Sequence, residues 1–313
     1  MNIVITGSAG FIASHLTDHL LSLGHTVTGI DNFITGRKKN IEHLLSNNKY
    51  EFIEADVVTF DYSVIKKPVD IVFHMASPAS PIQYKKYPIE TLEVNSVGTK
   101  RALDFAMHKN AKLVYASTSE VYGDPLVHPQ VEWYWGNVNP NGVRSCYDEA
   151  KRFGEAMCMS YVRKNSTQVR IARIFNTYGP RMDMQDGRVI SNFIVQGLKN
   201  ESITLYGNGL QTRSFCYVSD LVLGLTALAT KELANGEVIN LGNPNEMTVK
   251  AIAEKIKALT DSKAEISINP IEADDPLRRK PDISKAHELL EWEPHVSVDE
   301  GLTSTIEYFK PLV

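Results

Sequence analysis

The fold is decided by the stretch Asn2-Ile3-Val4-Ile5-Thr6-Gly7-Ser8-Ala9-Gly10-Phe11-Ile12-Ala13. Its first five residues suit a short buried strand, and the spacing Gly7-x-x-Gly10-x-x-Ala13 is typical of a tight turn before a helix. The N-terminus of such a helix faces a pyrophosphate. Ala13 stands where a third glycine is usual, but that glycine only lets helix and strand approach closely, so we expect alanine to be tolerated.

The residues after this loop complete a βαβ unit. A helical pattern over 11–23 ends at Gly24, and a second strand over 26–30 leads to Asp31. We expect Asp31 to accept hydrogen bonds from adenosine ribose hydroxyls and to repel a 2′-phosphate, which favours NAD over NADP. The basic run 37–39 is either a solvated face or a group near the ribose or pyrophosphate. The residues predicted to bind NAD are Gly7, Gly10, Phe11, Ile12, Asp31, Asn32, Thr35, Gly36, Asp56, Val57, Met75, Ser77, Tyr147 and Lys151.

Strands and helices alternate through the first half of the chain. Further strands are expected at 50–53, 71–74, 112–116 and 169–174, with helices at 88–108 and 147–164. This alternation predicts an α/β protein with a Rossmann-type doubly wound parallel sheet and a smaller C-terminal substrate-binding lobe. We assign residues 1–175 to an NAD-binding domain, with returning segments near 214–241, and residues 176–313 to the interleaved lobe.

The second half predicts shorter elements. Helices are expected at 189–199, 221–230, 249–259, 284–290 and 298–309, and strands at 203–206, 214–218, 238–241 and 264–268. We expect Ser219-Asp220 to cap the helix at 221–230 and Thr248 to cap the helix at 249–259.

The composition indicates an ordinary globular protein. Of its 313 residues, 43% are hydrophobic and 22% are charged, and the net charge of −4 argues against general affinity for nucleic acid or anionic membranes. No signal peptide and no stretch of membrane-spanning length is visible. The cysteines at 146, 158 and 216 form no Cys-x-x-Cys pattern, and no histidine has a partner at metal-ligand spacing. We therefore expect a cytoplasmic protein that holds no metal.

A polar cluster follows the strand expected at 112–116. Thr118 lies in the loop that the strand opens into, and Tyr147 and Lys151 form a Tyr-x-x-x-Lys pair on one face of a helix. A tyrosinate can take the proton of a substrate hydroxyl, although free tyrosine has a pKa of about 10. We expect Lys151 and the positive nicotinamide to lower the pKa of Tyr147, and Thr118 to align the same substrate oxygen.

These motifs together resemble the extended short-chain dehydrogenase/reductases that modify nucleotide sugars. Narrower matches lie at 31–37, 76–81, 117–125 and 175–182, and they are similar to the UDP-glucuronic acid decarboxylases. The resemblance implies oxidation of the sugar at C4 by NAD, loss of the C5 carboxylate from the resulting β-keto acid, and reduction by the same cofactor to give UDP-xylose. It also implies a homodimer built from the helices at 88–108 and 147–164.

The pair Ser119-Glu120 helps to distinguish between decarboxylases, 4,6-dehydratases and 4-epimerases. The resemblance places an Asp-Glu pair here in the 4,6-dehydratases, where the aspartate protonates the departing hydroxyl, whereas 4-epimerases usually lack the glutamate. A serine cannot be that acid, and it avoids repulsion with a substrate carboxylate. We therefore favour decarboxylation, with Glu120 managing the C5 proton directly or through water. A dehydratase or epimerase is the alternative, and a non-catalytic dinucleotide sensor is disfavoured because Thr118, Tyr147 and Lys151 are all present.

A UDP-sugar acid carries two phosphates and a carboxylate, so arginines are needed to bind it. The residues predicted to bind the substrate are Asn176, Arg188, Tyr206, Arg213 and Arg278. Arg213 and Arg278 resemble the diphosphate contacts of the family, and the sequence does not decide between Arg278 and Arg279. Tyr206, before a Gly-Asn-Gly turn, is expected to stack on uracil.

Overall fold

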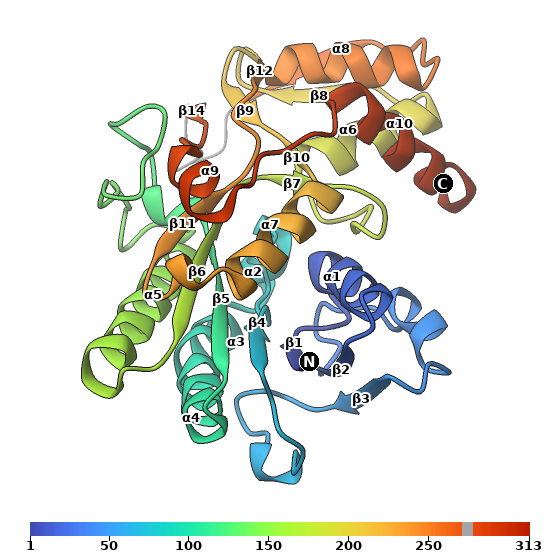
Figure 1. Cartoon of the computed structure of the whole chain (residues 1–313). Coiled ribbons are helices and arrows are strands. Elements are labelled where there is room, and N and C mark those ends of the chain that lie inside the picture. Colours follow the sequence, from blue (N-terminus) through green and yellow to red (C-terminus); the bar gives the residue numbers. More distant parts are fainter. Residues whose placement is uncertain (271–277) are drawn as a thin grey trace.

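A seven-stranded parallel sheet runs through the molecule (Figure 1). The computed structural model describes residues 1–270 and 278–313, so Asp275 and Pro276 of the motif around Arg278 lie outside the described residues. The strand order is β11-β6-β5-β4-β1-β2-β3, and every neighbouring pair is parallel. The strands are β1 (Asn2–Thr6), β2 (Thr26–Asp31), β3 (Tyr50–Glu54), β4 (Ile71–His74), β5 (Lys112–Thr118), β6 (Val169–Ile174) and β11 (Val238–Leu241). This topology confirms the predicted Rossmann-type fold.

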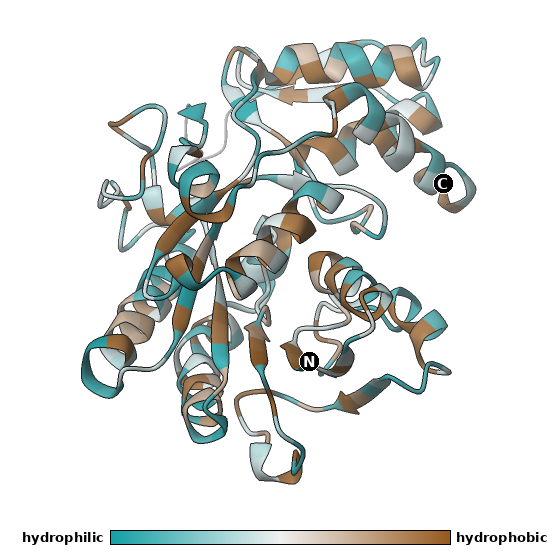
Figure 2. Cartoon of the chain, viewed as in Figure 1, coloured by the Kyte–Doolittle hydropathy of each residue, from teal (hydrophilic) through white to brown (hydrophobic). Residues whose placement is uncertain are grey.

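Helices cover both faces of the sheet, because successive side chains of a strand point to opposite faces. Ile3 and Ile5 of β1 belong to one core cluster, whereas Val4 belongs to another. The helices over the first cluster are α1 (Phe11–Ser22), α7 (Val218–Thr230) and α9 (Ser284–Leu290). The helices over the second are α4 (Thr99–Lys109) and α5 (Ser145–Asn165). Figure 2 shows the central strands and α7 as largely hydrophobic.

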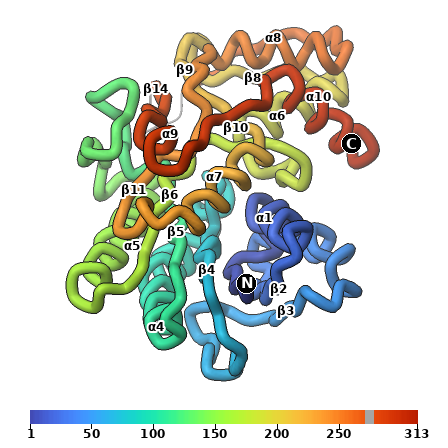
Figure 3. The backbone as a smooth tube through the Cα atoms, in the orientation of Figure 1, coloured from blue at the N-terminus to red at the C-terminus, as the bar shows by residue number. Residues whose placement is uncertain are grey.

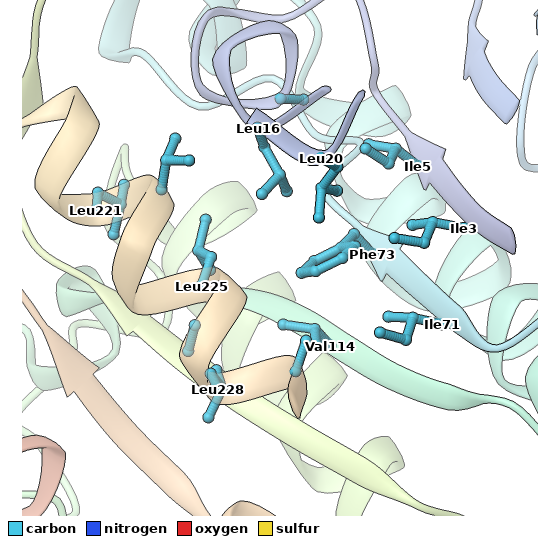
Figure 4. Close-up of a cluster of buried hydrophobic side chains, with 14 of the residues drawn as sticks. Ile3, Ile5, Leu16, Leu20, Ile71, Phe73, Val114, Leu221, Leu225 and Leu228 are labelled. Atoms are coloured by element: carbon cyan, nitrogen blue, oxygen red, sulfur yellow. The ribbon is translucent and has the colours of Figure 1, made fainter. Parts of the chain in front are cut away.

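The first cluster is made of interleaved aliphatic side chains (Figure 4). Leu16 and Leu20 of α1 and three leucines of α7 face the strand residues. The strand side chains they meet are Ile3, Ile5, Ile71, Phe73 and Val114. Burying side chains of this size contributes about 1.5–3 kcal/mol each to folding. The late helix α7 is thus part of the core beneath the glycine loop.

The C-terminal half forms a separate core above the carboxyl end of the sheet (Figure 3). Its helices are α6 (Val189–Lys199), α8 (Val249–Leu259) and α10 (Val298–Phe309). Its short strands are β7 (Thr177–Tyr178), β8 (Ile203–Tyr206), β9 (Thr212–Ser214), β10 (Cys216–Tyr217), β12 (Glu246–Thr248), β13 (Ile266–Asn269) and β14 (Arg278–Arg279). The remaining short helical turns are η1 (Lys38–Asn40), η2 (Glu42–Leu44), η3 (Tyr62–Val64), η6 (Glu232–Ala234) and η7 (Lys310–Leu312). As predicted, the Thr248 hydroxyl caps α8 by accepting from the Ala251 N–H.

Two local predictions were wrong, and one expected helix contains an irregular turn. The chain is helical over 88–109, as expected for 88–108, but α3 (Pro88–Glu93) and α4 are joined within it by a π-helical turn, η4 (Val94–Gly98), whose buried Asn95 donates to the Ser77 hydroxyl. Helix α7 begins at Val218, before the expected cap, and the Asp220 carboxylate accepts from the backbone N–H groups of residues 295 and 296 instead of capping the helix. The strand expected over 214–218 is divided into β9, which pairs with β12 and β14, and β10, which pairs with β7.

No helix in the described part of the chain combines the length and the apolar composition needed to cross a bilayer.

Candidate active site

A cleft of about 570 Å³ lies between the carboxyl end of the sheet and the C-terminal half. This edge of a parallel sheet is where ligands bind in doubly wound folds. The volume is typical of small-molecule sites. Every residue predicted to bind cofactor or substrate, or to act in catalysis, lines this cleft except Arg278.

The glycine loop leaves the start of α1 open to a ligand. Gly7 has a φ of +70°, and a Cβ there would lie 2.7 Å from the Cα of Ala76, so only glycine fits. Gly10 is the N-cap of α1 and provides no side-chain cap to the first-turn N–H groups. Uncapped N–H groups at a helix N-terminus suit the pyrophosphate of a dinucleotide. Ala13, in place of the third glycine, packs in the core at 3% exposure.

Asp31 closes β2 at the ribose end of this loop. Its carboxylate accepts from the Ala9 N–H (2.9 Å) and the Phe33 N–H (2.8 Å). Burial raises the pKa of Asp31, while these backbone hydrogen bonds act to lower it. Arg37 forms an ion pair across the cleft with Asp183, and this pairing favours neither of the two roles left open for the basic run.

Helix α5 carries Tyr147 and Lys151 and is held against the sheet by a buried ion pair. Glu155 accepts from the Ser117 hydroxyl of β5 at 2.5 Å and from both ends of the Arg173 guanidinium of β6 at 2.9 and 2.8 Å. Bidentate pairs of this kind fix orientation as well as distance. Gly154 lets the helix approach, since a Cβ there would overlap the Tyr115 hydroxyl.

The predicted catalytic residues meet at the end of β5. Tyr147, Lys151 and Thr118 are all at least nine-tenths buried, and the Lys151 Nζ lies 5.8 Å from the centre of the Tyr147 ring. Burial raises the pKa of Tyr147, while a hydrogen bond with Thr118 acts to lower it. Burial also lowers the pKa of Lys151 to about 7, and its Nζ donates to the Ala116 carbonyl at 2.8 Å. In the protein alone, burial therefore outweighs the expected lowering of the Tyr147 pKa.

Ser119 and Glu120 begin the short helix η5 (Ser119–Tyr122) beside this cluster. The Glu120 carboxylate is paired with Arg279 and Arg144, and the Ser119 hydroxyl lies 3.4 Å from an Nη of Arg279. Burial acts to raise the pKa of Glu120, but Arg279 and then Arg144 outweigh it and hold the pKa at about 2. In the protein alone, the two arginines therefore favour the ionised form of Glu120.

The residues predicted to hold the substrate surround the same cleft with one exception. Asn176 and Arg213 line it from buried backbone segments, Arg188 pairs with Asp186 at 2.6 Å, and Tyr206 is 41% exposed at the rim. The side chain of Arg278 is exposed and does not line the cleft, whereas its neighbour Arg279 is buried in it. Adjacent residues of a strand point to opposite sides, and β14 places Arg279 on the inner side.

Three residues near Tyr147 were not assigned from the sequence. Tyr84 of α2 (Pro81–Lys86) stacks face to face on the Tyr147 ring, with centroids 4.9 Å apart and planes 6° apart. Arg144 pairs with Glu120, and burial raises the pKa of the neighbouring Asp148 to about 7. The spacing of Arg144 and Asp148 at i and i+4 is a signal that a sequence reading could have used. Tyr84 carried no such signal, because it is 63 positions away from Tyr147 in a separate helix.

The fold, the open glycine loop and the buried Tyr-Lys-Thr cluster define a dinucleotide-dependent enzyme that acts on an alcohol. The family model of the NAD dependent epimerase/dehydratase family matches residues 3–242, and the chain belongs to this family. NAD is the cofactor of this family, as predicted.

Among curated relatives, UDP-glucuronic acid decarboxylase 1 of Xenopus tropicalis is 54% identical over 98% of this chain and 72% of its own length. UDP-glucuronic acid decarboxylase 1 of Arabidopsis thaliana is 52% identical over 99% of this chain and 70% of its own. Among solved structures, UDP-glucuronic acid 4-epimerase from Bacillus cereus, in complex with UDP-glucuronic acid and NAD, is 31% identical, with a TM-score of 0.91 over all of both chains.

Proposed function

We propose that this protein converts UDP-glucuronate to UDP-xylose. The observation that carries the proposal is the uncharged Ser119 beside a Glu120 held ionised by Arg279 and Arg144, next to Thr118 and Tyr147. This arrangement lacks the acid that a dehydratase needs at position 119, and it offers arginine donors for a substrate carboxylate. The identity of more than 50% to decarboxylases, against 31% to the 4-epimerase, supports the same choice.

Tyr147 is the proposed base for the sugar 4-hydroxyl. Its phenolate would take the hydroxyl proton while Thr118 aligns the oxygen. Bound NAD would supply the hydride acceptor for C4 and, once reduced, the hydride donor for the later reduction, in which Tyr147 would give its proton back to the oxygen on C4. The β-keto acid then breaks its C5–carboxyl bond, carbon dioxide leaves, and the electron pair moves to the oxygen on C4, where Tyr147 and Thr118 stabilise it. The final product keeps no net change in oxidation at C4.

Protonation at C5 needs a proton donor beside the sugar. An ionised carboxylate can orient a water molecule as donor, and Arg279 and Arg144 fix the direction of that carboxylate. We propose that Glu120 acts through such a water. The pyrophosphate of NAD is proposed to lie at the N–H groups of Phe11 and Ile12, with Asp31 at the adenosine ribose.

The C-terminal segment 176–313 is proposed to hold the UDP group. Arg213 is 8% exposed and lines the cleft, so a diphosphate bound there would be well shielded from water. Arg188 and Asn176 line the same wall, and Tyr206 at the rim is proposed to stack on uracil. Arg279 replaces Arg278 in this proposal, because only Arg279 reaches the cleft.

A homodimer is proposed from an apolar surface on α3, η4 and α5. Ile89, Leu92, Val97 and Phe153 are between 41% and 61% exposed there. Such a cluster is typical of a protein interface, and the helices match those of the predicted four-helix arrangement. Phe153→Glu should convert a dimer into a monomer in sedimentation velocity, whereas Leu233→Glu, at a 71% exposed position on η6, should not. A monomeric wild-type protein would refute this part of the proposal.

The three cysteines are free thiols in the structure, which suits the reducing cytoplasm proposed as its location. Localisation of a tagged chain by cell fractionation tests this, and recovery in an oxidising compartment would contradict it.

The reaction is tested by mixing purified protein with UDP-glucuronate and catalytic NAD. Equal amounts of carbon dioxide and UDP-xylose are expected. Tyr147→Phe should keep NAD binding and lose turnover by at least about a hundredfold, since it lacks the group that takes the proton. UDP-galacturonate as the product, with no carbon dioxide, would overturn the proposal in favour of a 4-epimerase.

A further inference from the structure

The ring of Tyr84 covers the ring of Tyr147 inside the cleft. The two phenol rings are 4.9 Å apart and nearly parallel, and Tyr84 is only 1% exposed. Helix α2 brings Tyr84 there directly after the segment 76–81, which also lines the cleft. An aromatic pair of this kind contributes about 0.5–1.5 kcal/mol beyond the area it buries. The contact therefore constrains the orientation of the Tyr147 ring.

The Tyr84 ring is held by packing rather than by its hydroxyl. That hydroxyl is buried and has no hydrogen-bond partner among the described residues. The backbone carbonyl of Tyr84 accepts from the Cys146 thiol at 3.6 Å, which links α2 to the start of α5 one residue before Tyr147. Ring and hydroxyl can thus be separated by substitution, because phenylalanine keeps the packing and leucine does not.

We infer that Tyr84 is a positioning residue for Tyr147: its stacked ring fixes the orientation of the phenol and keeps water from its face. The inference rests on the proposed function, in which Tyr147 is the base. A base that must approach one substrate oxygen loses much of its effect when it is displaced by about 1 Å, to the extent of roughly a hundredfold in rate. The hydrogen bond with Thr118 is made to the phenol oxygen of Tyr147, and one such bond does not by itself fix the plane of the ring.

The stack also sets how strongly Tyr147 is desolvated. Burial is the largest cause of its raised pKa, and Tyr84 supplies one wall of that burial. The other titratable or charged groups that face Tyr147 are Lys151 and Asp148 of α5, Glu120 of η5, Tyr115 of β5 and Arg188 at the start of α6. Replacing Tyr84 by phenylalanine or leucine leaves all of these residues in the sequence. Opening this wall to water should therefore lower the pKa of Tyr147.

The test compares Tyr84→Phe with Tyr84→Leu in the full-length protein, using pH profiles of UDP-xylose formation. Tyr84→Phe should keep kcat within about twofold and leave the acidic limb of the kcat profile in place. Tyr84→Leu should lower kcat by roughly ten- to a hundredfold, with a smaller change in KM, and should move the acidic limb to lower pH. Rescue by phenylalanine is the signature of a role for the ring.

A matched control is Tyr134→Leu, which removes a similar stack of Tyr134 on Tyr122, with centroids 6.1 Å apart and planes 8° apart, between two residues that do not line the cleft. It should change thermal stability without moving the acidic limb. The inference is overturned if Tyr84→Leu and Tyr84→Phe behave alike, or if Tyr84→Leu lowers kcat with no shift of the limb. Full activity of Tyr147→Phe would instead overturn the assignment of the base, so the two failures are distinguishable.

Discussion

Replacing Arg279 should show how much its ion pair with Glu120 contributes to the stability of the folded protein. The Arg279 side chain is 2% exposed and that of Glu120 is 15% exposed, so their ion pair is buried. Burial acts to raise the pKa of Glu120, yet its pKa is held at about 2 instead of 4.5, chiefly by Arg279. A difference of this size corresponds to about 3 kcal/mol. Breaking a buried pair by removing one partner typically costs about 3–5 kcal/mol, and we expect Arg279→Met to lie in that range.

The sign of the pH dependence follows from the lowered pKa. Between pH 4.5 and 2 the unfolded chain takes up a proton at this carboxyl while folded Glu120 remains ionised, so the wild type loses stability as the pH falls through that window. Arg279→Met raises the folded pKa, so the variant should lose less stability on acidification. Urea denaturation at pH 6 and pH 3 measures both effects. The control is Arg37→Met at the exposed pair with Asp183, which should cost less than about 1 kcal/mol.

The double variant Glu120→Gln with Arg279→Met separates folding from chemistry. The double variant leaves no carboxylate at position 120 to lose its pair with Arg279, and Arg144 keeps its pair with Asp148 at 3.8 Å, so the double variant should recover at least about 2 kcal/mol relative to Arg279→Met. Its decarboxylation should remain lost, because the oriented carboxylate is absent. The reasoning about the buried pair would be refuted if the free energy of unfolding of Arg279→Met lay within about 1 kcal/mol of the wild-type value and fell by the same amount between pH 6 and pH 3.

Three further predictions concern Lys151, Asp31 and Ser119. Lys151→Met should lower turnover at least about a hundredfold. Because burial lowers the folded pKa of Lys151 to about 7, the unfolded chain binds more protons than the folded chain between pH 7 and 10.5, so the free energy of unfolding of the wild type should rise from pH 7 to 9 relative to that of the variant. The same pH dependence of unfolding in urea for both proteins would contradict this. Asp31→Ser should raise the affinity for NADP relative to NAD by about tenfold or more in calorimetry, since it removes the carboxylate that would repel a 2′-phosphate, and an unchanged ratio would count against its placement at the ribose. Ser119→Asp should keep the fold and reduce carbon dioxide release by about tenfold or more, because the new carboxylate competes with Glu120 for Arg279 and repels the carboxylate of the substrate. Unchanged carbon dioxide release would show that the uncharged side chain at position 119 is not needed for decarboxylation.

Much of the fold follows from local sequence signals. The bounds of β1, β4, β6 and α8 agree with the expected ranges because alternating strands, apolar runs and a capping threonine are determined within a few residues. The features that local signals did not predict depend on distant partners. Asp220 looked like a helix cap but binds the backbone at 295–296, and the π-helical turn in the helix expected at 88–108 places Asn95 against Ser77.

In the candidate site, too, some residues could be predicted from local sequence signals and others depend on distant partners. Gly7, Asp31 and the Tyr147–Lys151 pair could be placed from spacing alone, since each belongs to a single βαβ unit or a single helix. The surroundings of Glu120 could not, because Arg279 comes from a strand some 160 residues away and only the register of β14 selects it over Arg278. The contact of Tyr84 with Tyr147 could not be predicted either, because stacking between residues of two separate helices leaves no pattern in the sequence of either helix.

The central claim is that the sugar carboxylate is lost after oxidation at C4 and that the C4 hydrogen returns to the same carbon. The most direct measurement uses UDP-glucuronate labelled with ¹³C in the carboxyl group, incubated with the protein and NAD in deuterated water and followed by NMR. We predict one labelled carbon dioxide for each UDP-xylose, with deuterium at C5 and none at C4. Label retained in a uronic acid epimerised at C4, with no deuterium at C5, would contradict the account.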